Sequence, residues 1–199
     1  MEKAGAAFRL RGGLFDRERT LRLMPDYLEY DNKDLVSEPF TRVRKEDMAD
    51  ISYSADWNIW YRFYVGSTYR INIKTKDHRV LRVKFTSYFS ANEKVNDAYD
   101  TIVNLLWEYY LEDIVTERLE EFEASKKLQL AGFTLTEHGV TVPEKKLFIE
   151  WGDVELKEYE AYHMVYNRQQ PTEHQDIRLG EWGSEVLYSI IKKLKKRTS

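Results

Sequence analysis

The residues of this chain best suited to acid–base or metal chemistry are its four histidines, His78, His138, His163 and His174. None has a partner at a metal-ligand spacing such as that of the HExxH motif. The sequence also lacks a nucleophile elbow, a phosphate-binding loop and a dinucleotide fingerprint. It has no cysteine, which excludes disulfides, thiolate catalysis and cysteine-ligated metals. We therefore expect no enzymatic activity and no cofactor or metal.

The residue types best suited to binding are concentrated in the stretch WNIWYRFYVG, from Trp57 to Gly66, where five of ten residues are aromatic. If the stretch is one strand, the odd-numbered residues 57–65 share one face, which we interpret as core. The even-numbered face carries Trp60, Arg62 and Tyr64, and these residue types are enriched at binding hot spots. The alternative is that Trp60 and Tyr64 pack under a helix or between two domains.

A predicted hairpin with a basic outer face follows this stretch. In YRINIKT and RVLRVKF, apolar and polar residues alternate with period two, which predicts a half-buried antiparallel pair. Residues 61–91 contain seven basic residues and one acidic residue, a net charge of +6. This face would either bind an anion or an acidic protein surface, or remain an ordinary solvated sheet face. Its candidate binding residues are Arg70, Lys74, Arg82 and Lys84.

The remaining charge is distributed unevenly, although the whole chain of 199 residues has a net charge of only −3. Residues 92–127 have a net charge of −6, and residues 128–182 have a net charge of −5. Such asymmetry indicates contact surfaces rather than a particular fold. No apolar run approaches membrane length, and the N-terminal residues lack the apolar core of a secretory signal. We expect a cytoplasmic protein, with peripheral attachment at the inner membrane surface as the alternative.

The elements that must position these residues occur in the order strands, helix, strands, helix. A period of three to four residues predicts one helix of about 30 residues after residue 90 and a second near the C-terminus. The two halves align loosely, LRLMPDYLEYDNK with FTLTEHGVTVPEK and FTRVRKEDMADISYS with KLFIEWGDVELKEYE. The predicted fold class is α+β, mainly β. It has two antiparallel units, residues 15–123 and 128–199, each closed by a C-terminal amphipathic helix.

This duplicated plan resembles tandem domains of the pleckstrin-homology-like superfold, especially its small bacterial and GRAM-type members. The resemblance depends on three features of each half: a leading hairpin, a strand with Asp before an aliphatic residue (Asp50-Ile51 and Asp153-Val154), and a closing helix. It implies a bent sheet that forms a barrel-like sandwich, with the helix covering its open corner. Members bind phosphoinositides, peptides or proteins, and some only scaffold, so the fold alone selects no function.

The first hairpin departs from the pattern of the lipid-binding members, which place several basic residues in and after it. Here the region offers Arg17, Arg19, Arg22 and Lys33, interrupted by the acids Asp26, Glu29, Asp31 and Asp34. This argues against specific phosphoinositide binding.

Three functional hypotheses follow from the sequence. The first is a non-enzymatic binding or scaffold protein that presents the two candidate surfaces to a protein partner or to a second copy of itself. The second is peripheral binding to anionic membrane lipids through the same surfaces. The third is an enzyme of unrecognised type. We expect no nucleic-acid partner.

Overall fold

A computed structural model of the chain describes residues 5–13, 15–34, 40–88, 92–143 and 147–198. The chain forms two compact units, residues 1–112 and 113–199. The sequence predicts the boundary between the units at residues 124–127.

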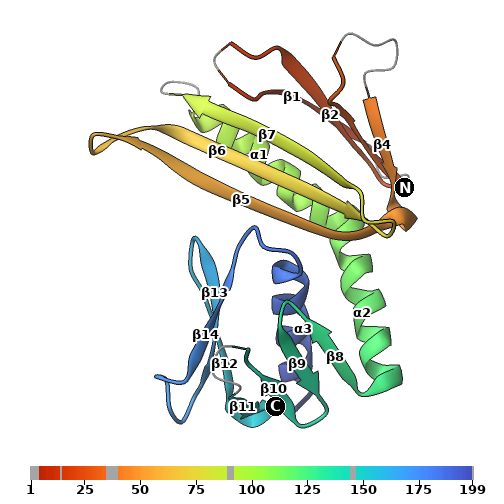
Figure 1. The fold of residues 1–199 in the computed structure, drawn as a ribbon, viewed down its shortest axis with the longest axis vertical. Coiled ribbons are helices and arrows are strands. Elements are labelled where there is room, and N and C mark those ends of the chain that lie inside the picture. Colours follow the sequence, from red (N-terminus) through yellow and green to blue (C-terminus); the bar gives the residue numbers. More distant parts are fainter. Residues whose placement is uncertain (1–4, 14, 35–39, 89–91, 144–146, 199) are drawn as a thin grey trace. The chain divides into compact units, whose positions relative to one another are not determined.

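Unit 1 contains two antiparallel sheets and a helix (Figure 1). The first sheet has the order β1-β2-β3-β4, and the second has the order β5-β6-β7. The bounds of the strands are β1 (Ala6–Arg11), β2 (Glu18–Met24), β3 (Tyr27–Asp31), β4 (Phe40–Arg44), β5 (Met48–Trp60), β6 (Phe63–Thr75) and β7 (Val80–Tyr88). A short 3₁₀ turn, η1 (Lys45–Asp47), joins the two sheets.

The core of unit 1 confirms the period-two predictions. Leu21, Leu23 and Leu28 of the first sheet are fully buried, as are Ile71 and Ile73 of the second. Burying each such side chain contributes about 1.5–3 kcal/mol. The apolar stripe of the long helix covers this interior, because its residues Ile102 and Leu106 are fully buried as well.

The long helix predicted after residue 90 is confirmed as three consecutive segments without a break. They are α1 (Asn92–Leu106), a π-helical segment η3 (Trp107–Leu111) and α2 (Glu112–Ser125). Two aromatic side chains of the π segment form hydrogen bonds with the sheets of unit 1. The indole Nε1 of Trp107 donates to the Tyr53 hydroxyl at 2.8 Å, and the Tyr110 hydroxyl contacts the carbonyl oxygens of Met24 and Tyr27 at 2.6 and 2.8 Å.

Unit 2 also contains two antiparallel sheets, of orders β11-β10-β9-β8 and β12-β13-β14. Its strands are β8 (Lys127–Leu130), β9 (Phe133–Thr136), β10 (Gly139–Thr141), β11 (Phe148–Glu150), β12 (Val154–Glu158), β13 (Tyr162–Asn167) and β14 (His174–Arg178). A 3₁₀ turn, η4 (Trp151–Asp153), joins the sheets, and α3 (Ser184–Thr198) ends the unit. Leu187, Ile190 and Ile191 of α3 are fully buried, which confirms the predicted apolar face of this helix.

The two units repeat the same order of elements: four strands, a 3₁₀ turn, three strands and a helix. The two aligned segment pairs in the sequence correspond to β2–β3 with β9–β10, and to β4-η1-β5 with β11-η4-β12. The mainly β class of the fold is therefore confirmed. The described strands do not close into a barrel, since the four sheets remain separate and each has two edge strands.

Candidate functional site

The aromatic stretch 57–66 is not one strand but the end of the β5–β6 hairpin. Trp60 pairs with Phe63, so Tyr61 and Arg62 form a two-residue turn. Both turn residues have positive φ, 46° and 82°. Two-residue hairpin turns with positive φ at both positions favour Asn-Gly. Other residues adopt such conformations at a cost of about 1–3 kcal/mol each, often at functional sites.

The prediction that the odd-numbered residues from 57 to 65 form part of the core is wrong. At this end of the hairpin five large side chains are exposed: Trp57 by 65%, Ile59 by 65%, Tyr61 by 83%, Phe63 by 71% and Tyr64 by 46%. The physical reason is that β7 ends at Tyr88, opposite Gly66, and the hairpin continues beyond it as a two-stranded ribbon (Figure 1). We call Trp57, Ile59, Tyr61, Arg62, Phe63 and Tyr64 the hairpin tip.

A β-bulge in the ribbon changes the face on which Tyr64 lies. Asn58 pairs with Gly66 but Ile59 pairs with Tyr64, which leaves Val65 as the extra residue. The rings of Trp57 and Tyr64, predicted on opposite faces, are therefore neighbours, edge to face with centroids 6.4 Å apart. The Tyr64 hydroxyl also lies 2.9 Å from the Ser67 hydroxyl.

Glycine is required at position 66 of this bulge. Its φ is +149°, and an added Cβ would lie 2.0 Å from the carbonyl oxygen of Ser87. The sequence contained this signal, because an isolated Gly in a strand pattern suggests a bulge or a close approach of two backbones.

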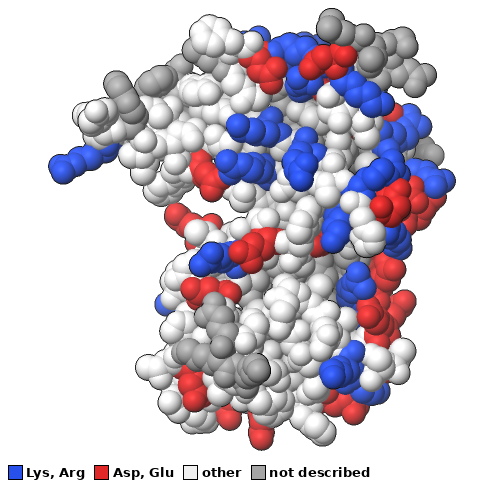
Figure 2. Space-filling view, viewed as in Figure 1, with Lys and Arg blue, Asp and Glu red and all other residues white. Residues whose placement is uncertain are grey.

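The candidate residues of the basic face do lie together. Arg70 is directly opposite Lys84, and Arg82 is opposite Asn72, the second residue after Arg70. Lys and Arg side chains gather over β6 and β7 in Figure 2. Acidic residues of β5 partly neutralise this face: Asp56 forms an ion pair with Arg70, and Asp50 pairs with Lys74 in the strand register.

The structure does not join the basic face to the tip. Arg62 precedes Arg70 by eight residues, which is about 25 Å of extended chain at about 3.3 Å per residue. This exceeds the Debye length of about 8 Å in physiological salt. Of the seven predicted site residues, Arg62 and Tyr64 thus belong to the tip and four belong to the basic face. The backbone of Trp60 ends β5 at the tip, and its side chain lies outside the described part of the structure.

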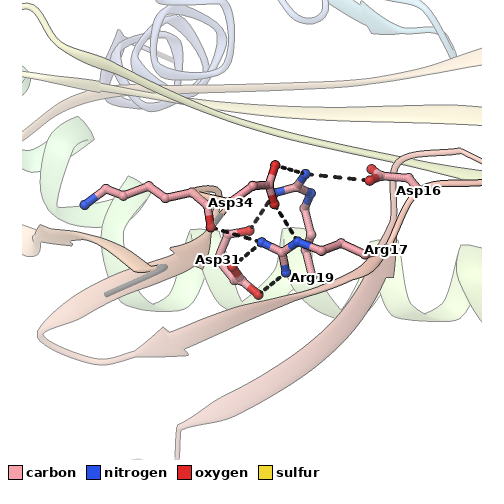
Figure 3. A network of polar contacts seen from close by, with 6 residues as sticks. Asp16, Arg17, Arg19, Asp31 and Asp34 are labelled. Atoms are coloured by element: carbon pink, nitrogen blue, oxygen red, sulfur yellow. Dashed lines mark hydrogen bonds and ion pairs between the residues drawn. The ribbon is translucent and has the colours of Figure 1, made fainter. Parts of the chain in front are cut away.

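The bases near the first hairpin are engaged with acids of the same region (Figure 3). The guanidinium of Arg17 donates to both carboxylate oxygens of Asp31, at 2.6 and 2.7 Å, and to Asp34 at 2.6 Å. Arg19 donates to Asp34 at 3.1 Å and lies 3.6 Å from Asp16. The hydrogen bond from Arg17 holds the pKa of Asp31 below its usual range. Arg17 and Arg19 are therefore neutralised by neighbouring acids.

The histidines form no metal centre within the described residues. No group of three or more His, Asp or Glu side chains there could hold a metal ion. His163 packs against the Tyr188 ring at 3.9 Å between centroids, and its Nε2 lies 3.9 Å from a carboxylate oxygen of Glu185. His78 and His138 lie in turns, as predicted, whereas His174 begins β14.

Comparisons of the chain with protein-family models, curated proteins and solved structures gave no match. Among the described residues, no helix is both long and apolar enough to cross a membrane. The hairpin tip groups five exposed large apolar side chains on one part of the described surface.

Proposed function

We propose that this chain is a non-enzymatic binding protein, built of two pleckstrin-homology-like units, that docks on a protein partner through the hairpin tip. The observation that carries the proposal is the exposure of five large apolar side chains at one end of the β5–β6 hairpin. Isolated exposed apolar residues are ordinary, but a contiguous group of this size marks an interaction site. The repeated order of sheets and helices supports the pleckstrin-homology-like assignment.

The exposed apolar area of the hairpin tip is large enough to contribute substantially to binding a partner. Large side chains bury about 150–250 Å² each, so five that are half to four-fifths exposed offer roughly 500 Å². At about 25 cal/mol per Å², burying this area would contribute about 12 kcal/mol before the costs of association. Those costs are about 4–15 kcal/mol, so the hairpin tip supports binding only when a partner covers most of it.

Arg62 favours a protein partner over a lipid bilayer. It lies in the turn, so insertion of the hairpin tip end-on would carry its charge deepest into the membrane, where a charged side chain costs about 2.5–3.5 kcal/mol or more. The basic face is too distant to add attraction to lipid headgroups in that orientation. A protein surface can instead offer a carboxylate to the guanidinium and apolar walls to the rings. The basic face would then steer acidic partners toward this unit.

Membrane attachment is the second candidate, because apolar side chains occupy both faces of the ribbon. Ile59 and Tyr64 are paired and share one face. Phe63 pairs with Trp60 and lies on the opposite face. A bilayer interface surrounds an inserted ribbon and could cover both faces at once.

The test compares the double variant Tyr61→Ser, Phe63→Ser with Phe15→Ser as the matched control. Phe15 is 97% exposed and lies outside the hairpin, so its replacement removes one exposed ring elsewhere in unit 1, compared with two in the tip variant. After cross-linking in the cells that make the protein, we expect the control to retain the co-purified partners of the wild type and the tip variant to lose them. Recovery of the same partners by the tip variant would refute the proposal.

A second experiment, with lipid vesicles, distinguishes docking on a protein partner from membrane attachment. Wild-type protein is floated with vesicles of phosphatidylcholine and phosphatidylserine at low and high salt. We expect no flotation that depends on the hairpin tip. If the wild type and Phe15→Ser float with the vesicles but the tip variant does not, the hairpin tip binds a membrane rather than a protein partner.

A further inference from the structure

The basic face lies on the outer side of the β5-β6-β7 sheet, where acids of β5 stand beside the cations of β6. Asp56 of β5 forms an ion pair with Arg70 of β6, and Asp50 lies opposite Lys74 in the strand register. The sheet order places β6 between β5 and β7, so these acids flank β6 on one side only. The basic residues of β6 therefore have carboxylates beside them within the same sheet.

Arg82 and Lys84 of β7 have no acid beside them in the sheet. Their partners in the register are Asn72 and Arg70, an amide and another cation. Both side chains are exposed, and among the described residues neither forms a hydrogen bond or an ion pair. Like charges that face each other directly on a sheet destabilise it, and Lys84 faces Arg70 in this way. β7 thus keeps two uncompensated positive charges on the outer side of the sheet, where Lys and Arg gather in Figure 2.

The spacing of these two charges matches that of an extended acidic segment. Arg82 and Lys84 are two residues apart on one strand, so their Cα atoms are about 6.6 Å apart and their side chains project to the same side. An extended partner segment with Asp or Glu at every second position presents carboxylates at the same interval. Arginine binds a carboxylate through two parallel N–H donors, and lysine binds it as a point charge. The ion pair of Asp56 with Arg70 is a carboxylate contact of this kind on the same face.

The chemistry of the outer side favours a protein over a nucleic acid or a membrane. The only aromatic residues of 68–74 in β6 and 80–86 in β7 are Tyr69 and Phe85. Both are buried on the inner side of the sheet, so no ring projects outward there. Proteins that bind single strands of nucleic acid stack the bases on such rings, and peripheral membrane proteins use them as anchors in the interface. Two basic residues without an apolar anchor attract an anionic membrane only weakly.

We infer that Arg82 and Lys84 bind an acidic segment of a protein partner, in extended conformation and with carboxylates at alternate positions. The segment supplies to β7 the acids that β5 supplies to β6. This surface is separate from the hairpin tip, so the inference goes beyond the proposed function and is tested independently of it. A single partner that covers both surfaces must span about 25 Å, or about eight extended residues.

The probe is a synthetic peptide of alternating Glu and Ser, titrated into the isotope-labelled full chain at low ionic strength and followed by nuclear magnetic resonance. We expect the changes in amide shift to concentrate on β6 and β7. The pair Arg82→Glu with Lys84→Glu should weaken binding at least about tenfold, as loss of close charge contacts at an interface does. The pair Arg9→Glu with Arg11→Glu is the matched control, because it reverses two exposed charges two residues apart on β1. It should leave the affinity unchanged.

A peptide of alternating Lys and Ser is the reversed probe. It should bind the Arg82→Glu, Lys84→Glu variant and not the wild type, which also shows that the variant is folded. An affinity for the acidic peptide that this variant retains, or that the control pair loses equally, overturns the inference. Tighter binding of oligothymidylate or of phosphatidylserine vesicles at these two residues, at equal ionic strength and equal concentration of negative charge, overturns it as well. The proposed function fails separately, if the Tyr61→Ser, Phe63→Ser variant keeps every co-purified partner.

Discussion

Replacing Tyr61 by Asn and Arg62 by Gly should stabilise unit 1 and abolish its binding through the hairpin tip. Both residues have positive φ in the native turn, 46° and 82°. Asn and Gly adopt these conformations readily, and Asn-Gly is the preferred pair for this type of turn. Little packing is lost with the tyrosine ring, since Tyr61 is 83% exposed.

The size of the stabilisation follows from the two dihedral angles. A left-handed conformation costs an ordinary residue about 1–2 kcal/mol. Glycine relieves nearly all of this at position 62 and asparagine part of it at position 61, while the greater freedom of glycine in the unfolded chain costs about 0.5–1 kcal/mol. The net gain is about 1–2 kcal/mol. For a unit of about 110 residues this raises Tm by about 4–8 °C.

Differential scanning calorimetry measures the transition of unit 1, and co-purification after cross-linking measures partner binding by the same variants. Phe15→Asn is the control, because it removes an exposed ring of unit 1 without changing the turn. A Tm at or below that of the wild type would show that the Tyr-Arg turn is not strained. A gain in Tm with binding intact would show that the strained residues are not retained for binding.

Three further predictions concern the framework around the hairpin tip. Tyr110→Phe should destabilise unit 1 by about 1–2 kcal/mol, because it deletes a buried hydroxyl that contacts two carbonyl oxygens. Tyr64→Phe deletes a hydroxyl on a half-exposed ring and should change Tm by less than about 2 °C. Thermal unfolding compares the two variants, and equal shifts in Tm would contradict the role given to burial. Gly66→Ala should lower the free energy of unfolding by about 2 kcal/mol or more, because the new Cβ meets a backbone carbonyl oxygen and φ is positive. Urea unfolding measures this loss. A midpoint equal to that of the wild type would show that the bulge relaxes to accept the Cβ. The pKa of Asp31 is lowered by the hydrogen bond from Arg17, so this carboxylate stabilises the folded state above its unfolded pKa of about 4 and loses that contribution as the pH falls through the lower folded value. Asp31→Asn should therefore flatten the decline of stability below about pH 4, and an unaltered acid unfolding curve would exclude this linkage.

The regular elements could be predicted from the sequence because their signals are local. Alternation at Leu21 and Leu23 and at Ile71 and Ile73 fixed the strands and their buried faces. The three-to-four period gave both helices, and the order of apolar positions gave the repeat. Each of these signals lies within a window of about 15 residues, where periodicity is most informative.

The hairpin tip could not be predicted in the same way. Tyr61 and Arg62 are not among the residue types that favour turns, so the sequence predicts one continuous strand through them. The bulge before Gly66 then moves Tyr64 to the other face, since one extra residue inverts the alternation of side chains. The exposure of the tip depends on where β7 ends, which is a tertiary property. The pairing of Arg17 with Asp31 is likewise set by the register of separate strands and not by local pattern.

The uninterrupted helical backbone from Asn92 to Ser125 has a consequence for how the chain folds. Tyr110 and Leu111, at the end of unit 1, are buried, and so are Ile114 and Val115, at the start of unit 2. Starting a helix is unfavourable by a factor of about a thousand, whereas extending one is nearly free. The N-terminal unit, synthesised first, thus presents a formed helical end to which residues 113–125 add without a new nucleation event, and we expect a helix-breaking substitution near residue 112 to slow the folding of unit 2.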